Sequence, residues 1–289
     1  MTTLAVLHPG AMGAAVAGQA VAAGHRLVWV PAGRGAATRR RAEAAGLTEC
    51  ASLGEALSAS DIVLSVCPPQ AAEEVAAAVA AHGYGGVYVD GNAISPQRMR
   101  GISDRMPPAC TVLDGMLSGP PPNGSGPVRF YLAGDPGARR EVEGVFAGTR
   151  VLVRATEGDI GSASALKLAI TGYQKISRLL AGVAYALATD HGVAELLRTE
   201  AEAMNKDILD DPAYLPSVAA RAWRWGPEMA EIADTLRATG LPPDLAEAAA
   251  HVYTRWAPFK DQDMPLGPLL EHLHDKHHDN TGGHHSGPA

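Results

Sequence analysis

The chain has 289 residues, of which 46% are hydrophobic and 19% are charged, so it is long enough to bury a sizeable core in one or two domains. Its net charge of −7 argues against nucleic acid or an anionic membrane as a partner, because both attract basic surfaces. No apolar run is as long as a membrane span, and the N-terminus shows no secretory signal pattern. Cys50, Cys67 and Cys110 have no metal-ligand spacing, so we expect a reduced, cytoplasmic protein without a metal site.

The first segments of the chain have the pattern of a βαβ unit. Residues 4–7 form an apolar run of the length of a buried strand, an Ala- and Val-rich helical segment stops at Gly24, and a second apolar run follows at 27–30. A turn that contains Gly10 and Gly13 joins the first strand to the helix. Such a turn lets a pyrophosphate approach the backbone and rest on the N-terminus of the helix.

The glycine pattern of this turn is incomplete, because His8 occupies the first position of G-x-G-x-x-G. Its place directly after the first strand still favours a dinucleotide site over a tight βα turn of another kind. The cofactor-binding residues that we expect in this turn are His8, Pro9, Gly10, Ala11, Met12 and Gly13.

The end of the second predicted strand favours NADP over NAD. An acidic residue about 20 residues after the glycine turn would hold the ribose hydroxyls of NAD, but residues 30–42 contain none. Arg34 is suited to pair with a 2′-phosphate, and Thr38 and Arg39 are additional candidates. The alternative is that these residues form the solvated basic start of a helix.

Strands and helices alternate to about residue 155. Further strands are expected at 61–67, 87–92, 111–114, 128–133 and 151–153, with helices between them. This alternation predicts an α/β fold with a mostly parallel, doubly wound sheet. Ligands bind at the carboxyl ends of the strands in such a sheet, so we expect Cys67, Pro68, Pro69 and Asn92 to contact the cofactor.

From about residue 157 the strand signals stop. Residues 161–190 form a long, mostly apolar stretch that must be buried by a domain or a subunit, and further helices are expected at 216–236, 245–256 and 266–274. We predict a Rossmann domain at 1–156, an all-helical substrate and dimerisation domain at 157–275, and a polar tail at 276–289. Six histidines follow from His272 onward, and a solvated tail is favoured over adventitious metal binding.

Two segments carry the candidate chemistry. Ser118 and Gly119 are expected in a loop after the strand at 111–114, where a hydroxyl and backbone N–H groups suit a substrate carboxylate. Lys167 lies in an apolar run, where a lone ammonium is costly unless it is paired or used. Desolvation moves the pKa of a lysine toward neutrality, which suits a general acid or base. The alternative is a structural ion pair or a snorkelling side chain.

Together these features resemble the β-hydroxyacid dehydrogenase superfamily, which includes 3-hydroxyisobutyrate dehydrogenase and 6-phosphogluconate dehydrogenase. Residues 8–13 look like its cofactor loop, Ser118 and Gly119 like its substrate loop, and residues 161–167 like the start of its catalytic helix. The C-terminal part looks more like a 6-phosphogluconate-dehydrogenase-like branch with a domain of unknown function; the residues that carry this likeness are Lys175, 221–225 and 228–233.

The resemblance implies a dehydrogenase in which Lys167 donates a proton to a carbonyl oxygen as NADPH delivers hydride to the carbon, or takes the proton back in the oxidation. It also implies a homodimer whose long helices help to build each active site. The family usually places an Asn four residues after the lysine, but Thr171 stands here and its hydroxyl donates one bond. Gln174 and Lys175, about one turn farther along, are further candidates for substrate contact.

Two other functions remain as alternatives. An imine reductase shares this architecture but generally carries Asp or Tyr at the position of Lys167. A non-catalytic NADP-binding sensor would keep the glycine turn and would not need the lysine. The expected partner is a small oxo or hydroxy acid, and the loop at 120–126 is either a mobile cover or a rigid surface loop.

Overall fold

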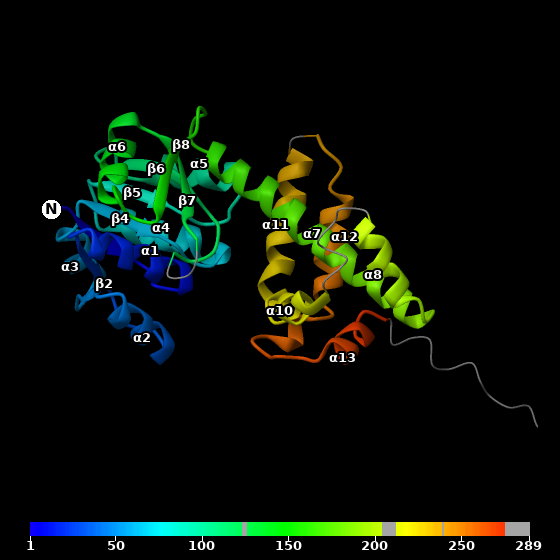
Figure 1. Cartoon of the computed structure of the whole chain (residues 1–289). Helices are drawn as coiled ribbons and strands as arrows, with labels where there is room; N and C mark the ends of the chain where they lie inside the picture. The colour runs from blue at the N-terminus through cyan, green and yellow to red at the C-terminus, as the bar shows by residue number, and fades with distance from the viewer. Residues whose placement is uncertain (123–125, 204–211, 239, 275–289) are drawn as a thin grey trace, which may run out of the picture. The chain divides into compact units, whose positions relative to one another are not determined.

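The computed structural model describes residues 1–122, 126–203, 212–238 and 240–274. The chain forms two compact units, Met1–Ile170 and the part from Thr171 onward (Figure 1). The division falls inside the long helix α7 (Ser162–Asp190), whereas the boundary predicted from the sequence precedes that helix. The predicted tail at 276–289 and residues 123–125 of the predicted loop lie outside the described residues. No helix in the described part of the chain has the length and apolar character of a membrane span.

The first unit is built on one sheet of eight strands. Their order is β3-β2-β1-β4-β5-β6-β7-β8, and all neighbours are parallel except β6 and β7. The strands are β1 (Thr3–Val6), β2 (Arg26–Trp29), β3 (Thr48–Glu49), β4 (Ile62–Ser65), β5 (Val87–Asp90), β6 (Thr111–Ser118), β7 (Val128–Gly134) and β8 (Val151–Ala155). The mostly parallel, doubly wound α/β sheet predicted from the sequence is confirmed.

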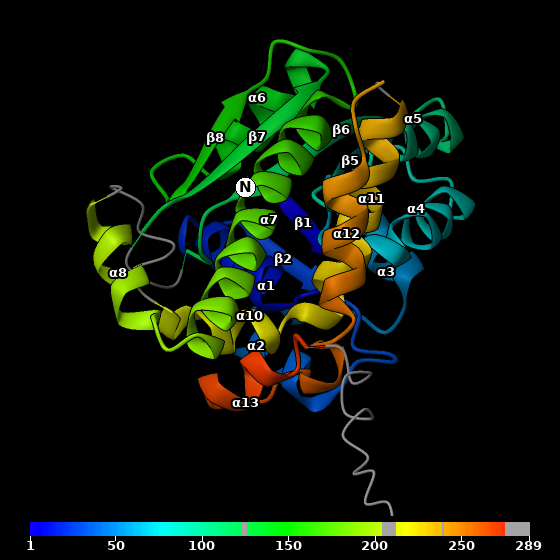
Figure 2. The same cartoon turned by 90° about the vertical axis from the view of Figure 1, so that its right-hand side faces the viewer.

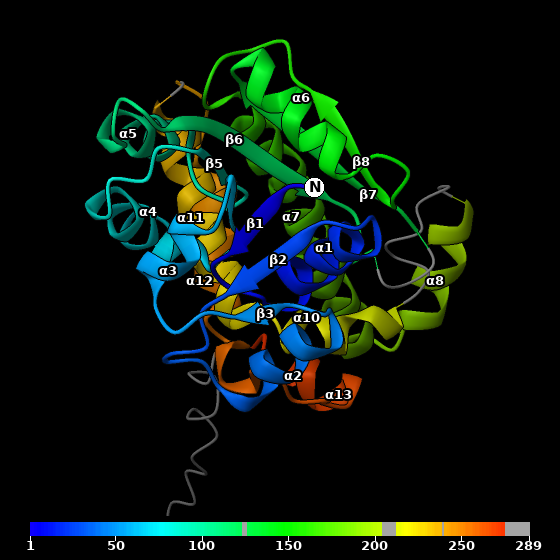
Figure 3. The ribbon, with the colours of Figure 1, turned by 90° about the vertical axis from the view of Figure 1, so that its left-hand side faces the viewer.

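Helices cover both faces of this sheet (Figure 3). They are α1 (Ala11–Ala22), α2 (Ala36–Ala44), α3 (Leu53–Ser58), α4 (Ala72–Ala81), α5 (Pro96–Arg105) and α6 (Pro136–Val145), with the short 3-10 helix η1 (Pro69–Ala71) before α4. Apolar side chains of α1, α2 and α6 share one core with the strands, and those of α3, α4 and α5 share the other. All four residues of β4 and of β5 are buried, as expected for central strands between two helical layers.

Strand β6 is longer than predicted. It continues to Ser118 because it pairs antiparallel with β7, with Asp114 opposite Ala133 and Ser118 opposite Arg129. The prediction that this strand ends at Asp114 and that Ser118 lies in the following loop is therefore wrong. The sequence gives little sign of this pairing, since Gly115 and Gly119 are typical of a turn.

The second unit is helical throughout its described residues. It contains the rest of α7, α8 (Ala194–Ala203), η2 (Pro212–Tyr214), α10 (Leu215–Ala219), α11 (Ala222–Ala238), α12 (Asp244–Tyr253), η3 (Ala257–Phe259) and α13 (Leu266–Glu271). Helices α11 and α12 lie side by side (Figure 2). Tyr253 and Trp256 are fully buried and Trp225 is nearly so, whereas Trp223 remains 38% exposed. The aromatic residues therefore form a core of this unit.

Candidate active site

The turn between β1 and α1 is shaped to receive an anion. The Gly10 N–H donates to the His8 carbonyl at 2.7 Å, and a Cβ at Gly13 would lie only 2.8 Å from that same oxygen. At Gly10, no described heavy atom lies within 4 Å of where a Cβ would stand. In this described stretch, the first turn of α1 has neither a side-chain cap nor an acidic residue. Its N–H groups therefore suit a pyrophosphate, as the sequence predicts.

His8 and Arg34 place two unsatisfied polar atoms beside this turn. His8 Nδ1 and Arg34 Nε are buried, and within the described ranges neither has a hydrogen-bond partner. Burial, and secondarily the charge of Arg34, lower the pKa of His8 to about 4, so the imidazole is neutral at physiological pH. Buried polar atoms are normally hydrogen-bonded. These two fit a phosphate-bearing cofactor that brings its own oxygens.

Arg39 and Arg41, which follow Arg34 in α2, already have partners. Arg39 lies 3.9 Å from the Glu49 carboxylate and donates to the Pro31 carbonyl at 3.0 Å. Thr38 Oγ1 accepts a hydrogen bond from Arg41 Nη2 at 3.1 Å. Arg41 Nε also reaches the Pro9 carbonyl at 3.4 Å, so Arg41 supports the cofactor turn. The sequence analysis missed Arg41, although its position one helical turn after Thr38 was a signal.

Asn92 holds the loop that follows β4. Its Oδ1 accepts from the Cys67 N–H at 2.6 Å, and its Nδ2 donates to Asp90 Oδ2 at 3.1 Å and Ser65 Oγ at 3.2 Å. Burial raises the pKa of Cys67 to about 11, so its side chain stays a neutral thiol. The amide of Asn92 thus has partners within the protein on both its oxygen and its nitrogen, and these bonds fix the loop.

Arg98 of α5 fixes the proline segment of this loop. Pro69 lies in η1, and its carbonyl accepts from Arg98 Nη2 at 2.7 Å. Arg98 in turn forms an ion pair with Glu73 of α4. Cys67, Pro68 and Pro69 therefore form a rigid rim at the carboxyl end of β4, where the sequence predicts cofactor contact.

Two buried carboxyl groups lie opposite each other on β5 and β6. Asp90 and Asp114 are register partners, and each is almost fully buried. Burial raises the pKa of Asp90 to about 7, and the nearby Asp114 adds to the increase. Burial also raises the pKa of Asp114. The sequence analysis did not single out these residues, although an Asp at the end of each apolar run was visible.

Asp114 caps the N-terminal end of α7. Its carboxylate accepts from the Gly161 N–H at 2.9 Å, from the Ser164 N–H at 3.0 Å and from the Ser164 hydroxyl at 2.7 Å. Three bonds from one buried carboxylate fix the start of the helix against β6. They also satisfy helix N–H groups that would otherwise lack acceptors.

Lys167 lies one helical turn beyond this cap. Its Nζ donates to the Leu117 carbonyl of β6 at 2.9 Å, and Leu117 directly precedes Ser118 and Gly119. Gly119 has a φ of +122°, and a Cβ there would lie 3.1 Å from the Pro127 carbonyl. The structure thus brings the predicted catalytic lysine and the predicted substrate segment together at the end of β6.

Arg129 is a further basic residue at this position. Its Nη2 donates to Ser118 Oγ at 3.3 Å from the neighbouring strand β7. Among the residues that the structure describes, no carboxylate pairs with this exposed guanidinium. The sequence analysis missed Arg129, because its approach to Ser118 depends on the antiparallel pairing of β6 with β7.

The remaining predicted residues belong to the second unit. Thr171 is buried and Gln174 is exposed. Lys175 forms an ion pair with Glu228, and its Nζ lies 4.9 Å from the centre of the Trp225 ring. Lys175 is thus held by a carboxylate and an aromatic face within its own unit.

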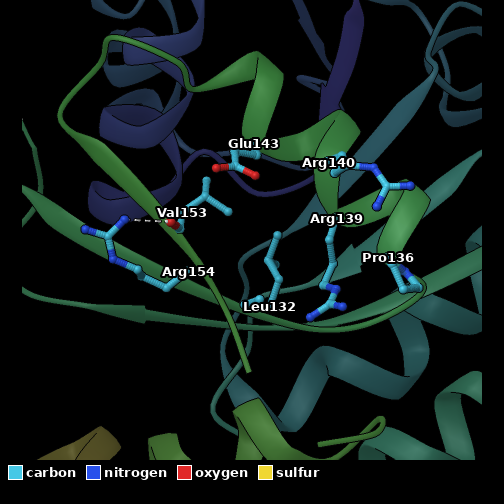
Figure 4. Close-up of a pocket in the computed structure, with 8 residues that line it drawn as sticks. Leu132, Pro136, Arg139, Arg140, Glu143, Val153 and Arg154 are labelled. Carbon is cyan, nitrogen blue, oxygen red and sulfur yellow. Dashed lines mark hydrogen bonds between the residues drawn. The ribbon is translucent and has the colours of Figure 1, made fainter. Parts of the chain in front are cut away.

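Two cavities lie elsewhere and contain no predicted site residue. A cavity of about 320 Å³ lies between α6 and the strands β7 and β8 (Figure 4). A second, of about 490 Å³, lies in the helical unit among η3, α12 and the segment after α13. The first is lined by Leu132, Pro136, Arg139, Arg140, Glu143, Val153, Arg154 and Ala155, so it belongs to the outer edge of the sheet rather than to the glycine turn.

Two family models match parts of this chain. Residues 3–93 match the family model described as NADP oxidoreductase, coenzyme F420-dependent, and residues 188–256 match a domain of unknown function, DUF1932. A search of the curated proteins found no match. A 3-hydroxyisobutyrate dehydrogenase from Mycobacterium tuberculosis, solved with L-serine, has a TM-score of 0.72 at 21% identity, over 95% of this chain and 100% of that chain.

The chain has the fold of the 3-hydroxyisobutyrate dehydrogenases.

Reductases of imines share this dehydrogenase fold. An imine reductase from Bacillus cereus has a TM-score of 0.57 at 19% identity, over 94% of this chain and 98% of that chain. A reductive aminase from Aspergillus terreus, solved with NADPH and ethyl levulinate, has a TM-score of 0.55 at 20% identity, over 95% of this chain and 100% of that chain. The resemblance inferred from the sequence is confirmed as a fold, and the expected enzyme class, an NAD(P)-dependent oxidoreductase, agrees with the match at residues 3–93.

Proposed function

We propose that this protein is an NADPH-dependent oxidoreductase that interconverts a hydroxy acid and its oxo acid. The observation that carries the proposal is the placement of Lys167, whose Nζ lies 2.9 Å from the Leu117 carbonyl, next to the Ser118–Gly119 segment. That arrangement joins a proton donor to a segment suited to a carboxylate. Both lie in the unit that contains the glycine turn.

The residues around the turn fit NADP(H) better than NAD(H). NADPH, when bound, supplies the hydride. The N–H groups at the start of α1 would hold its pyrophosphate, and Arg34 would pair with its 2′-phosphate through a guanidinium whose Nε has no partner among the described residues. The adjacent neutral His8 adds a buried ring nitrogen that accommodates a further hydrogen bond.

Lys167 is the proposed general acid and base. In the direction of reduction its ammonium group donates a proton to the carbonyl oxygen as the carbon receives hydride, and in oxidation the neutral amine takes that proton from the hydroxyl. The Leu117 carbonyl accepts one of its N–H bonds and so orients the group toward the end of β6. Thr171, one turn farther along α7, is the proposed second donor to the same substrate oxygen.

The substrate carboxylate is proposed to bind at Ser118 and Gly119. The Ser118 hydroxyl and the guanidinium of Arg129, 3.3 Å from it, offer hydrogen-bond donors at the strand end. Arg129 has no carboxylate partner among the described residues, so an anionic substrate would supply one. This favours an acid over a neutral imine as the compound that is reduced.

A substrate panel tests the reaction class. Purified protein is mixed with NADPH or NADH and with small oxo acids or cyclic imines, and oxidation is followed at the nicotinamide absorbance band. The proposal predicts oxidation of NADPH by at least one oxo acid. Oxidation by imines alone would favour the imine reductase, and NADPH binding without any turnover would favour the non-catalytic sensor.

We also propose that the protein is a homodimer formed through α7. Tyr173 and Leu180 lie seven residues apart, on one face of this helix, and are 73% and 66% exposed. Large apolar side chains in such a row are typical of a surface that another chain covers. Analytical ultracentrifugation of the wild type should give a dimer, and the Y173E/L180E variant should give a monomer.

A further inference from the structure

Helices α7 and α11 run antiparallel in the second unit. A Cβ at Gly172 would lie 3.4 Å from Ile232, and three residues later Lys175 forms an ion pair with Glu228. As the residue number rises along α7, the residue number of the contacting residue on α11 falls. One more turn along α7 therefore places Arg178 level with the start of α11, where Arg221 directly precedes the helix and Arg224 lies in its first turn.

A buried aromatic and ionic cluster supports this end of the two helices. The ring of Trp225 lies 4.9 Å from Lys175 Nζ and 5.1 Å from the guanidinium carbon of Arg221. The centres of the Trp225 and Tyr253 rings lie 5.8 Å apart in an edge-to-face arrangement, and the Tyr253 hydroxyl donates to the Lys175 carbonyl at 2.8 Å. These contacts hold in place the segments that carry Arg178, Arg221 and Arg224.

The charges in this region do not balance. Glu228 pairs with Lys175, and Asp261 is an acid that raises the pKa of Arg224 against the effect of burial. Within the described ranges, no ion pair involves Arg178, Arg221 or Arg224. Three guanidinium groups thus face a shortage of nearby negative charge.

Arg221 lies close enough to Arg178 and to Arg224 for their like charges to interact. Burial, followed by the charge of Arg178, lowers the pKa of Arg221. Burial, followed by the charge of Arg221, lowers the pKa of Arg224. Arg221 stays in place because it donates to the carbonyl and the hydroxyl of Ser217, both at 2.7 Å. Arg178 is held by a bond of 2.7 Å to the Gln174 carbonyl.

We propose that Arg178, Arg221 and Arg224 form a binding site for the phosphoryl group of a small-molecule ligand. Planar guanidinium groups bind phosphate oxygens in pairs, and three of them match a doubly charged group better than a single carboxylate. Bound phosphate relieves the repulsion among the arginines, so it is favoured over the empty cluster. The site lies in the helical unit.

The test uses the full chain with inorganic phosphate as the probe. An R34Q background removes the other place where a phosphate is expected, beside the glycine turn. Phosphate is added in increasing concentration, and sodium chloride at the same ionic strength serves as the control. The thermal unfolding midpoint is measured in both series, and calorimetry measures the heat of phosphate binding. The site predicts a saturable rise of the midpoint that chloride does not reproduce.

Matched arginine variants locate the response. Adding R178Q or R221Q should weaken phosphate binding at least tenfold, whereas adding R237Q should not, because Arg237 is in the same unit but is paired with Asp234 and Glu247. Without phosphate, R221Q should keep the far-UV circular dichroism and the cooperative unfolding of its R34Q parent, with a midpoint lowered only by the loss of the two bonds to Ser217. This excludes misfolding as the cause of a lost response.

Three results would overturn the proposal. The first is no saturable phosphate response in the R34Q protein. The second is an equal response in the proteins that carry R221Q and R237Q. The third is a tighter binding of malonate than of phosphate, which would assign the cluster to carboxylates instead.

Discussion

His8 occupies a position where the dinucleotide-binding pattern has glycine. The lowered pKa of its imidazole explains how a histidine fits beside Arg34 at this position. Burial and Arg34 lower its pKa to about 4, so no second positive charge competes with Arg34 for the cofactor. Gly10 and Gly13 are both kept: the space beside Gly10 is open, and Gly13 allows the close approach of the His8 carbonyl. A protonated side chain at the same place would repel Arg34.

Arg34 should determine the preference between the two dinucleotides. R34A removes the guanidinium that we propose pairs with the 2′-phosphate, so we expect NADPH affinity to fall about 10- to 100-fold, as for a lost charge-assisted hydrogen bond, and NADH affinity to change little. Fluorescence titration measures both. R39A is the matched control, because Arg39 is already engaged by Glu49. Equal weakening of NADPH and NADH in R34A would refute the assignment to the 2′-phosphate.

Arg129 should act on the substrate and not on the cofactor. R129Q keeps a hydrogen-bond donor but removes the charge beside Ser118, so KM for the oxo acid should rise about tenfold while NADPH affinity stays constant. Steady-state kinetics and a binding titration separate the two effects. R154Q, which changes an exposed arginine on the next strand, should leave KM unaltered. An unchanged KM in R129Q would place the substrate carboxylate elsewhere.

At the level of elements, strand β6 connects the parts of the proposed site. Asp114 caps α7, the Leu117 carbonyl accepts from Lys167, and Ser118 ends the strand. One strand therefore sets the distance between Lys167, the proposed general acid, and the Ser118–Gly119 segment proposed to bind the substrate. The antiparallel partner β7 keeps β6 extended over this whole length.

Loss of the cap should displace Lys167 without touching the cofactor turn. D114A leaves the Gly161 and Ser164 N–H groups without their acceptor, so we expect kcat to fall at least tenfold and the free energy of unfolding to fall by about 2–4 kcal/mol, the cost of several buried bonds. NADPH affinity should be retained. S164A should have a smaller effect of the same kind, because it removes one of the three bonds. A D114A protein with unchanged kcat would show that the cap is only structural.

The sequence predicts the repetitive part of this architecture and misses the contacts between its elements. The glycine turn, the alternating strands and the long helix follow from local periodicity and turn residues. The length of β6, and with it the approach of Arg129 to Ser118, depends on pairing with a strand that comes later in the chain. The capping role of Asp114 involves residues 50 positions away, so no local pattern marks it.

In the whole molecule, two buried groups should give opposite pH dependences of stability. The pKa of Asp90 rises to about 7 on folding, so between its ordinary value and pH 7 the folded state binds more protons and stability falls as pH rises. The pKa of His8 falls to about 4, so its contribution is present above its ordinary pKa of 6.5 and is lost as pH falls toward 4. The two effects oppose each other between about pH 4 and 6.5.

Single variants should reveal each effect separately. Relative to the wild type, D90N should become more stable as pH rises from 4 to 7, with an upper limit of roughly 4 kcal/mol set by the pKa shift. H8N should lose stability relative to the wild type over the same interval as pH rises. Urea unfolding at several pH values gives both slopes. Parallel pH profiles for the wild type and D90N would mean that Asp90 does not titrate in this range.

The most direct test of the account is a comparison of chemistry and cofactor binding in a Lys167→Met variant, with the substrate identified by the panel. The account predicts that NADPH affinity stays within twofold of the wild type while the rate of hydride transfer in a single turnover falls at least 100-fold, as expected when a general acid is removed. Lys260→Met, which changes a lysine that lies over Trp223, should leave both unchanged. A Lys167→Met protein that transfers hydride at the rate of the wild type would contradict the central role of this lysine.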